Sequence, residues 1–405
     1  MLRKVLVFIA LGIIFSLQVS IAQESQKEEN KKLQLSPYGF IKGDMFYATD
    51  GVYSFANPSN NYILAPQFAN GVDQSAISFT AQHTRLGLKG AVGEKIKVSG
   101  LVEIDFFGGP ADANTKIRLR QGYASVAKGG FEAKFGQQWD LFSPNNPNTV
   151  NTNGNMWYNG NMGFRRGQIQ LSYKWDNERI DPMIQVSVGE GAHETSGLGK
   201  DNLSGQPMYQ ARISGKLDDK YIVGVYFVNA TFKELKGTTV GDRVLAEDFT
   251  YSASGFGLDF NLPFNKYFSL IGEVNSGTNL ASANIFSAAG NYYYTLNEAG
   301  APKDFDRKNT GFWLNATSNV TDWLTAVVGY GMDQNNSDEF KVDAIESNSS
   351  IYLDLIFPIK HSYSVALEVN SINTKVVTAV DASNKITNSK DNKATIIALS
   401  GRVNF

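Results

Sequence analysis

The sequence predicts an all-β fold, a transmembrane β-barrel of sixteen antiparallel strands with short periplasmic turns and long extracellular loops. Three observations support this prediction: segments of about ten residues that alternate apolar and polar side chains, an apolar leader, and aromatic residues beside the short turns. A period of two places alternate side chains on opposite faces of a sheet. In a bilayer, strands satisfy all their backbone hydrogen bonds only when the sheet closes into a barrel.

The amino-terminal segment, residues 1–22, is predicted to be a signal peptide. Two basic residues precede an apolar run from Val5 to Val19, and Ser20-Ile21-Ala22 offers small residues for cleavage after Ala22. The run is short for the alternative, a membrane-anchoring helix. Residues 23–34 are charged, and we expect a short periplasmic segment there, followed by the barrel over residues 35–405. This arrangement predicts export to a bacterial outer membrane.

Composition excludes several classes of function. The chain has no cysteine, so disulfides and cysteine-bound zinc are excluded, and its net charge of -2 does not favour nucleic acid as a partner. His83, His193 and His361 are isolated, with the first expected on the lumen face, the second in a loop and the third at a short turn. A barrel lipase needs a Ser–His pair near the rim, oriented by a third polar group, and none is visible. We therefore predict a protein that is not an enzyme and has no cofactor.

Seven short turns and eight long loops divide the chain into sixteen strands. The turns carry Gly, Pro, Asn or Asp, which suit tight turns, and the loops are rich in Asn, Gly, Ser and Asp, as exposed loops are. The turns are expected near residues 92–95, 127–130, 176–179, 218–220, 263–266, 318–321 and 358–360. The loops are expected near residues 49–74, 107–115, 143–164, 190–206, 233–247, 276–308, 334–346 and 373–392.

Alternation assigns the two faces of the barrel. In one clear segment, Val98, Val102 and Ile104 share the lipid face, whereas Glu103 and Asp105 share the lumen face. The segments 350–357, 363–370 and 397–405 alternate in the same way.

Two regions fit this assignment poorly. Residues 221–231 are apolar on both faces, so their register stays open. Polar residues also fall on the predicted outward face of three strands, where lipid disfavours amides and hydroxyls. Either the register is shifted there or another subunit covers this wall, which suggests a homo-oligomer. The residues concerned are Thr80, Gln82, Thr84, Gln121 and Gln137.

An aromatic ring at one rim separates this prediction from a soluble β-sandwich, which would show the same alternation. Amphipathic aromatic residues are enriched where a membrane meets water. We expect the lipid and lipopolysaccharide of an outer membrane to surround the barrel. The aromatic residues beside short turns or a chain end are Tyr38, Phe131, Trp175, Tyr221, Tyr267, Trp323, Tyr363 and Phe405.

Charged residues of both signs are expected to line the lumen. The strongest local signal is the segment Lys116-Ile117-Arg118-Leu119-Arg120, in which period two stacks three cations opposite Glu103 and Asp105. One interpretation is a basic ladder that draws anionic solutes, because charged rings set selectivity. The other is an ion-pair network that only stiffens the wall. The candidate pore-lining and solute-binding residues are Lys42, Arg85, Glu103, Asp105, Lys116, Arg118, Arg120, Arg165, Arg166, Arg212 and Arg402.

The loop at residues 143–164 is a candidate for narrowing the channel. It contains Pro144, Pro147 and the pair Trp157-Tyr158, which would prefer shelter from water, and it ends at Arg165-Arg166. We expect this loop to fold inward. The alternative is an extracellular loop that packs on its own aromatic side chains.

Five motifs, taken in order, resemble the DcaP-like outer-membrane porins, most closely over residues 38–175. The resemblance implies a sixteen-stranded homotrimer that takes up small hydrophilic solutes, often anions such as dicarboxylates. It also implies that Arg85, Arg118 and Arg120, which match the basic strands of that family, contact solute. The chain departs from the family in lacking room in residues 23–34 for the long coiled-coil extension that members can carry. The motifs run from Gly39 to Asp44, Thr84 to Gly90, Val102 to Gly109, Ile117 to Tyr123 and Phe135 to Trp139.

Two functions follow from these observations. The first is a diffusion porin for small hydrophilic solutes with a preference for anions. The alternative is an adhesin or scaffold that acts through its long loops, chiefly residues 49–74 and 276–308. Calcium binding by the acidic stretch from Asp333 to Glu339 also stays open.

Overall fold

The computed structural model describes most of the barrel predicted from the sequence. The described residues are 32–50, 52, 74–107, 116–152, 156–177, 179–191, 204–290, 292–359 and 362–405. The predicted signal peptide at residues 1–22, His193, His361 and most of the predicted loop 49–74 lie outside these residues.

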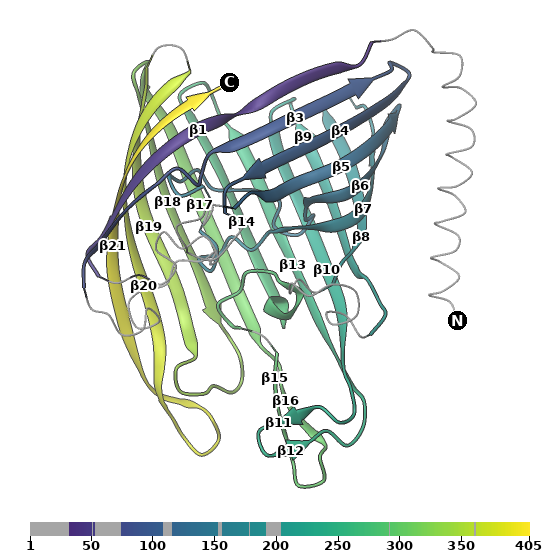
Figure 1. Ribbon diagram of the computed structural model, residues 1–405, viewed down its shortest axis with the longest axis vertical. Coiled ribbons are helices and arrows are strands. Elements are labelled where there is room, and N and C mark those ends of the chain that lie inside the picture. Colours follow the sequence, from purple (N-terminus) through teal and green to yellow (C-terminus); the bar gives the residue numbers. More distant parts are fainter. Residues whose placement is uncertain are drawn as a thin grey trace.

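The strands form one closed antiparallel sheet (Figure 1). Each strand pairs with its neighbours in the chain, and the last strand pairs with the first, from Phe40 with Asn404 to Ala48 with Ile396. The strands of the barrel are β1 (Gln34–Ala48), β2 (Ala76–Thr80), β3 (Arg85–Val92), β4 (Ile96–Asp105), β5 (Arg118–Lys128), β6 (Phe131–Trp139), β7 (Arg165–Lys174), β8 (Ile180–Gly189), β9 (Met208–Leu217), β10 (Tyr221–Glu234), β13 (Phe249–Pro263), β14 (Phe268–Thr278), β17 (Lys308–Thr321), β18 (Leu324–Asn335), β19 (Ile345–Pro358), β20 (Tyr363–Val380) and β21 (Ile386–Asn404).

The sheet has sixteen strand positions, because β2 and β3 are two halves of one interrupted strand. Both halves pair with β1, whereas only β3 also pairs with β4. The break at residues 81–84 places the buried His83 between the two halves. The prediction of a sixteen-stranded antiparallel barrel is therefore confirmed.

Two predicted connections were misplaced. The turn expected at residues 318–321 belongs to β17, and the chain turns instead at Asp322 and Trp323. The loop expected at residues 373–392 is mostly strand, because β20 runs to Val380 and β21 starts at Ile386. The start of β21 is polar on both faces from residue 388 to residue 392, and near the end of β20 the adjacent Val376 and Val377 are both buried. Neither strand end therefore shows the alternation that identifies a strand next to lipid.

Two small hairpins and one short helix lie in the described parts of the long loops. The first hairpin joins β11 (Thr239–Val240) to β12 (Arg243–Val244), and the second joins β15 (Tyr293–Leu296) to β16 (Pro302–Phe305). Figure 1 shows both at the bottom, at the long-loop rim, with the carboxyl terminus at the opposite rim. The 3₁₀ helix η2 (Leu280–Ala283) precedes the second hairpin. Among the described residues, no helix is long and apolar enough to cross a membrane.

The outer surface of the barrel exposes large apolar side chains. Phe79 is 73% exposed and Phe135 is 67% exposed, and Val102 is also exposed, whereas Glu103 and Asp105 are buried. An apolar surface of this extent on a sheet with polar inner faces indicates a wall that contacts lipid. The faces that alternation predicted for β4 are therefore confirmed.

The strand whose register stayed open, β10, has apolar residues on both faces for a structural reason. Val225 and Phe227 are exposed on the outside, whereas Tyr226 and Val228 are buried on the inside. The inner pair packs in a cluster with Phe142, which belongs to the connection between β6 and β7. Since protein rather than water fills this part of the lumen, the inner face of β10 is apolar too.

The predicted outward polar wall was wrong for most of its members. Thr80 is the cross-strand partner of Asp44 and shares its inward face, and the Thr84 hydroxyl accepts a hydrogen bond from the Lys42 amide inside the barrel. Gln121 donates to Glu103 at 3.5 Å. The interruption after β2 and a β-bulge in β5 shift the alternation, which sequence spacing does not reveal. A polar wall is therefore no argument for an oligomer.

Tyrosine rings cover glycines on neighbouring strands. Tyr38 lies over Gly87, Tyr226 over Gly257 and Tyr352 over Gly329, and each pair is a cross-strand pair. A ring placed over a glycine replaces the missing side-chain contacts of that position. A methyl group at Gly329 would lie 2.1 Å from the Tyr352 ring.

We predict that Gly329→Ala lowers the free energy of unfolding by about 1–3 kcal/mol, because overpacking must displace the Tyr352 ring. Urea unfolding of the protein in lipid vesicles, followed by tryptophan fluorescence, measures this change. Gly167→Ala is the matched control, since no atom lies within 4 Å of the added methyl group. Equal stability of the two variants would contradict the packing role of the Tyr352–Gly329 pair.

Candidate functional site

The connection between β6 and β7, residues 140–164, folds into the barrel, and we name it the inner loop. Its backbone amides are held by side chains of three different strands. The Asn145 amide donates to Glu273 at 2.6 Å, the Asn148 amide to Asn315 at 2.8 Å and the Val150 amide to Glu368 at 2.7 Å. These acceptors lie on β14, β17 and β20. The prediction that this loop folds inward is confirmed for its described residues.

The inner loop then reaches β1 through a buried polar network. The Lys42 ammonium donates to the Val150 carbonyl at 2.9 Å and pairs with Asp44. Asp44 contacts His83 Nδ1 at 2.5 Å, and His83 Nε2 contacts Asn151 at 3.0 Å. Lys42, a candidate pore-lining residue, thus serves to anchor the loop, and the isolated His83 has the same role.

A second connection, residues 279–290 after β14, also lies inside and packs on the inner loop. Phe286 stacks on Trp157 with ring centroids 4.2 Å apart, and the Phe286 amide donates to the Met162 carbonyl. The Ala288 amide donates to Asp333 at 2.8 Å. Sequence reasoning placed this segment in an extracellular loop. Its small and apolar residues, from Leu280 to Ala289, were the available sign of burial.

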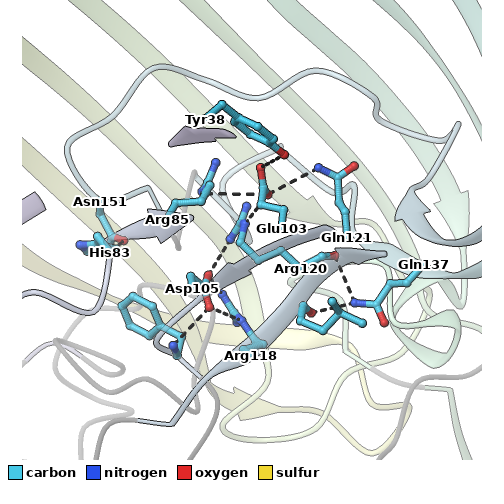
Figure 2. A network of polar contacts seen from close by, with 12 residues as sticks. Tyr38, His83, Arg85, Glu103, Asp105, Arg118, Arg120, Gln121, Gln137 and Asn151 are labelled. Atoms are coloured by element: carbon cyan, nitrogen blue, oxygen red, sulfur yellow. Dashed lines mark hydrogen bonds and ion pairs between the residues drawn. The ribbon is translucent and has the colours of Figure 1, made fainter. Parts of the chain in front are cut away.

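The predicted basic ladder and its acidic neighbours meet on β4 and β5 (Figure 2). Asp105 accepts from Arg118 at 3.0 and 2.6 Å and from Arg120 at 2.8 Å. Glu103 accepts from Arg120 at 2.9 Å and lies 3.9 Å from Arg85. Both interpretations of the ladder are thus partly realised, because three arginines share two carboxylates and leave an excess of positive charge.

We name the arginine-rich surface formed by Arg85, Arg118 and Arg120 the basic wall. A cavity of about 240 Å³ separates the basic wall from the inner loop. Arg402, on β21, adds a further cation, since its guanidinium stacks on Phe40 at 3.9 Å and the same ring lies 5.3 Å from Arg85. The loop side of the cavity carries no charge. The lining residues are Phe40, Arg85, Glu103, Arg120, Gln121, Trp139, Asn146, Pro147, Asn148, Thr149, Thr152 and Arg402.

We compared the chain with known proteins by sequence and by structure. No protein-family model matches the sequence, and no curated protein sequence matches it. Solved structures do match. The outer membrane channel DcaP of Acinetobacter baumannii superposes with a TM-score of 0.69 at 18% identity, over 92% of this chain and 97% of that one. The chain has the porin fold.

Two further porin-fold structures match over similar lengths. OmpT, an outer membrane protein of Vibrio cholerae, gives a TM-score of 0.57 at 10% identity over 92% of this chain and 98% of its own. An anion-selective porin from Comamonas acidovorans gives 0.55 at 12% identity, over 92% of this chain and all of its own. The resemblance to DcaP-like porins expected from the sequence motifs is thus supported by similarity of fold.

The remaining candidate residues lie elsewhere in the porin fold. Arg166 is buried and forms a bidentate ion pair with Asp140, and Arg212 forms a bidentate ion pair with Asp259. These ion pairs indicate that the two arginines have a structural role. Lys116 is exposed and forms an isolated bridge with Phe107, just before β5 begins. Arg165 is buried and has no such partner among the described residues.

The acidic stretch considered for calcium is occupied by other contacts. Asp333 lies inside the barrel, and Asp338 pairs with Lys308 at 2.5 Å at the long-loop rim. This pairing lowers the pKa of Asp338. Glu339 accepts from Asn384 at 2.9 Å. Within the described part of the chain, no group of three or more His, Asp or Glu side chains is placed to hold a metal ion.

We predict that Glu273→Leu loosens the inner loop and increases single-channel conductance. Glu273 accepts hydrogen bonds from Ser143, from the Asn145 amide and from Trp313, and its loss leaves these donors unsatisfied at a cost of about 1–3 kcal/mol. Recordings in planar bilayers measure the change, with Glu247→Gln as the control at an exposed loop acid. Unchanged conductance and current noise in a folded Glu273→Leu barrel would rule out this anchor.

Proposed function

We propose that this protein is an outer-membrane porin through which small hydrophilic solutes diffuse, with a preference for anions such as dicarboxylates. The supporting observation is the cavity between the basic wall and the inner loop. Arg85, Arg120 and Arg402 line it, whereas Glu103 is the only acid among the described lining residues. The inner loop has no acidic residue after Asp140, so it does not offset this charge.

The position of these charges matters because the cavity is narrow and its walls are protein. Fixed charges beside a constriction act on a passing ion at short range and with little screening. An excess of arginine therefore lowers the energy of an anion in the constriction and raises that of a cation. Guanidinium groups also match the planar geometry of a carboxylate. A channel with diffusing solutes needs no catalytic group, so we propose no enzymatic activity.

Export and membrane insertion follow from the leader and the apolar wall. We infer that residues 1–22 are removed, that residues 23–34 form a short periplasmic segment and that residues 35–405 form the barrel. Lipid and lipopolysaccharide would then contact the exposed apolar side chains. The short turns would face the periplasm and the long loops the outside.

We also propose that three copies of the chain assemble side by side. Phe79 projects from β2 beside an open hollow of about 510 Å³, whose lining includes the glycine pair Gly43 and Gly401. A wall that carries both a projecting ring and a hollow can bind a second copy of itself. A trimer form of Vibrio cholerae OmpT is among the matching structures. Trimerisation through the β1–β2 wall would bury Phe79.

An adhesin or scaffold remains the second candidate because of the long-loop rim. Tyr251 and Tyr292 stack with ring centroids 3.9 Å apart, next to Phe249 and Tyr294, where the two hairpins project. Such a rigid aromatic surface suits contact with another molecule. Absence of conductance would favour this second function over the first.

We expect the wild-type channel to show an anion-selective reversal potential across a potassium chloride gradient, and Arg85→Gln to reduce that selectivity. Arg85 is a suitable target because its ion-pair distance to Glu103 is long, so its charge is only weakly offset. Lys308→Gln, which removes a charge paired with Asp338 at the long-loop rim, is the control. A reversal potential of the opposite sign in the wild type would contradict the proposed anion preference.

We expect Phe79→Ala to shift the purified protein from trimers towards monomers in mild detergent, because it removes the projecting ring from the proposed interface. Light scattering coupled to size-exclusion chromatography measures the mass. Phe256→Ala is the matched control, since Phe256 is 66% exposed but lies on β13, far round the barrel. A monomeric wild type, or equal loss of trimer in both variants, would argue against this interface.

A further inference from the structure

Arg165, at the start of β7, is a buried cation without an acceptor. It is 3% exposed, its Nη1 atom has no hydrogen-bond partner, and no carboxylate among the described residues pairs with it. Two aromatic rings hold the guanidinium in place, with centroids 4.8 Å away for Trp139 and 5.1 Å away for Phe164. Burying a charge without a partner is costly, so a missing partner is expected here.

The next residue in the chain shows how unusual this is. Arg166 donates to Asp140 through Nε and Nη2, and its Nη1 donates to the carbonyls of Glu190 and Ala283 at 3.0 Å. The two arginines share the same strand end and a similar degree of burial. Within the part of the chain that the structure describes, only Arg166 is supplied with acceptors, which leaves Arg165 available for a ligand.

The charges around Arg165 define the ligand. The charged groups that act most strongly on it are three cations, Arg120, Arg118 and Arg85, and one acid, Asp105, which already binds Arg118 and Arg120. The local excess is therefore positive. A guanidinium presents a planar fork of donors that suits a carboxylate or a phosphate group.

We propose that Arg165 forms a binding subsite for a compact oxyanion, either a carboxylate or a phosphate group of the passing solute. The subsite adjoins the cavity, because the Trp139 ring that contacts Arg165 also lines the cavity. The inference rests on the proposed diffusion of anions through the lumen. It adds a binding site that is separate from the contacts that Arg85 and Arg402 would make with solute. Its function is to raise the local concentration of anionic solute beside the constriction.

The test uses the refolded full chain in planar bilayers, with inorganic phosphate and succinate added in separate experiments at constant ionic strength. The concentration of each anion that halves the chloride current reports its affinity. We expect Arg165→Met to weaken binding of at least one of the two anions about tenfold or more, as expected for the loss of a charge-assisted contact. If only the affinity for phosphate falls, the subsite recognises phosphate groups, and if only the affinity for succinate falls, it recognises carboxylates.

Two further variants make the result specific. Arg165→Lys keeps the positive charge and should restore part of the affinity, whereas Lys308→Met removes an equal charge at the long-loop rim and should leave the affinity unchanged. Thermal unfolding gives an independent measurement, because an anion that binds the native barrel raises its unfolding temperature. We expect this shift in the wild type and in Arg165→Lys, and a smaller shift in Arg165→Met.

Unchanged affinity for both anions in Arg165→Met would overturn the inference and assign Arg165 a packing role between the two rings. If Arg165→Met does not fold, equal affinity in the wild type and in Arg165→Lys, together with no anion-dependent shift in the wild-type unfolding temperature, overturns it as well. A cation-selective wild type would instead contradict the proposed function. If the wild type is anion-selective but Arg165→Met binds phosphate and succinate with unchanged affinity, only the Arg165 subsite is contradicted.

Discussion

Pairing of every backbone hydrogen-bonding group within the sheet is the constraint on which the rest of this structure depends. A wall that faces lipid offers no water to its amides and carbonyls, so the sheet must close, and β21 pairs with β1. Closure divides the side chains into an outer apolar set and an inner polar set. It also brings Lys42 of β1 beside Arg402 of β21. These two residues are cross-strand partners although they lie near opposite ends of the sequence. The site is therefore a consequence of closing the sheet.

The inside of the barrel uses its polar side chains in two ways. On one side, Glu273, Asn315 and Glu368 accept hydrogen bonds from the backbone of the inner loop, so these groups are consumed in holding the loop in place. On the other side, arginines outnumber the carboxylates that bind them, and their excess charge faces the cavity. The asymmetry follows from which backbone groups the loop turns towards each wall. The amides of Asn145, Asn148 and Val150 face β14, β17 and β20, and an N–H donor is satisfied by a carboxylate or amide oxygen, not by an arginine. The same loop lies inside the barrel, and the arginine-rich wall faces it across the cavity.

Much of the candidate site was predictable from the sequence. Arg118, Arg120, Glu103 and Asp105 lie on neighbouring strands of one hairpin, so their period-two spacing was enough to bring them together. Arg402 and the residues of the inner loop that complete the cavity were not predictable in that way. Their contacts join β1, β5 and β21 to a loop after β6, and alternation within one strand contains no information about the distance across a lumen.

The local pattern of residues specified the fold class, the number of strands and most lipid-facing positions, because period-two alternation and turn residues act over a few neighbouring positions. The tertiary structure decided where that pattern fails. The break after β2 turns Thr84 inward, the packing of the inner loop makes Tyr226 and Val228 of β10 apolar on the inside, and a bulge in β5 places Gln121 beside Glu103. Among the described residues, it also left Arg165 without an acceptor while pairing Arg166 with Asp140. Such differences arise from contacts between segments far apart in the chain, which become defined only when the barrel has closed and its loops have packed inside.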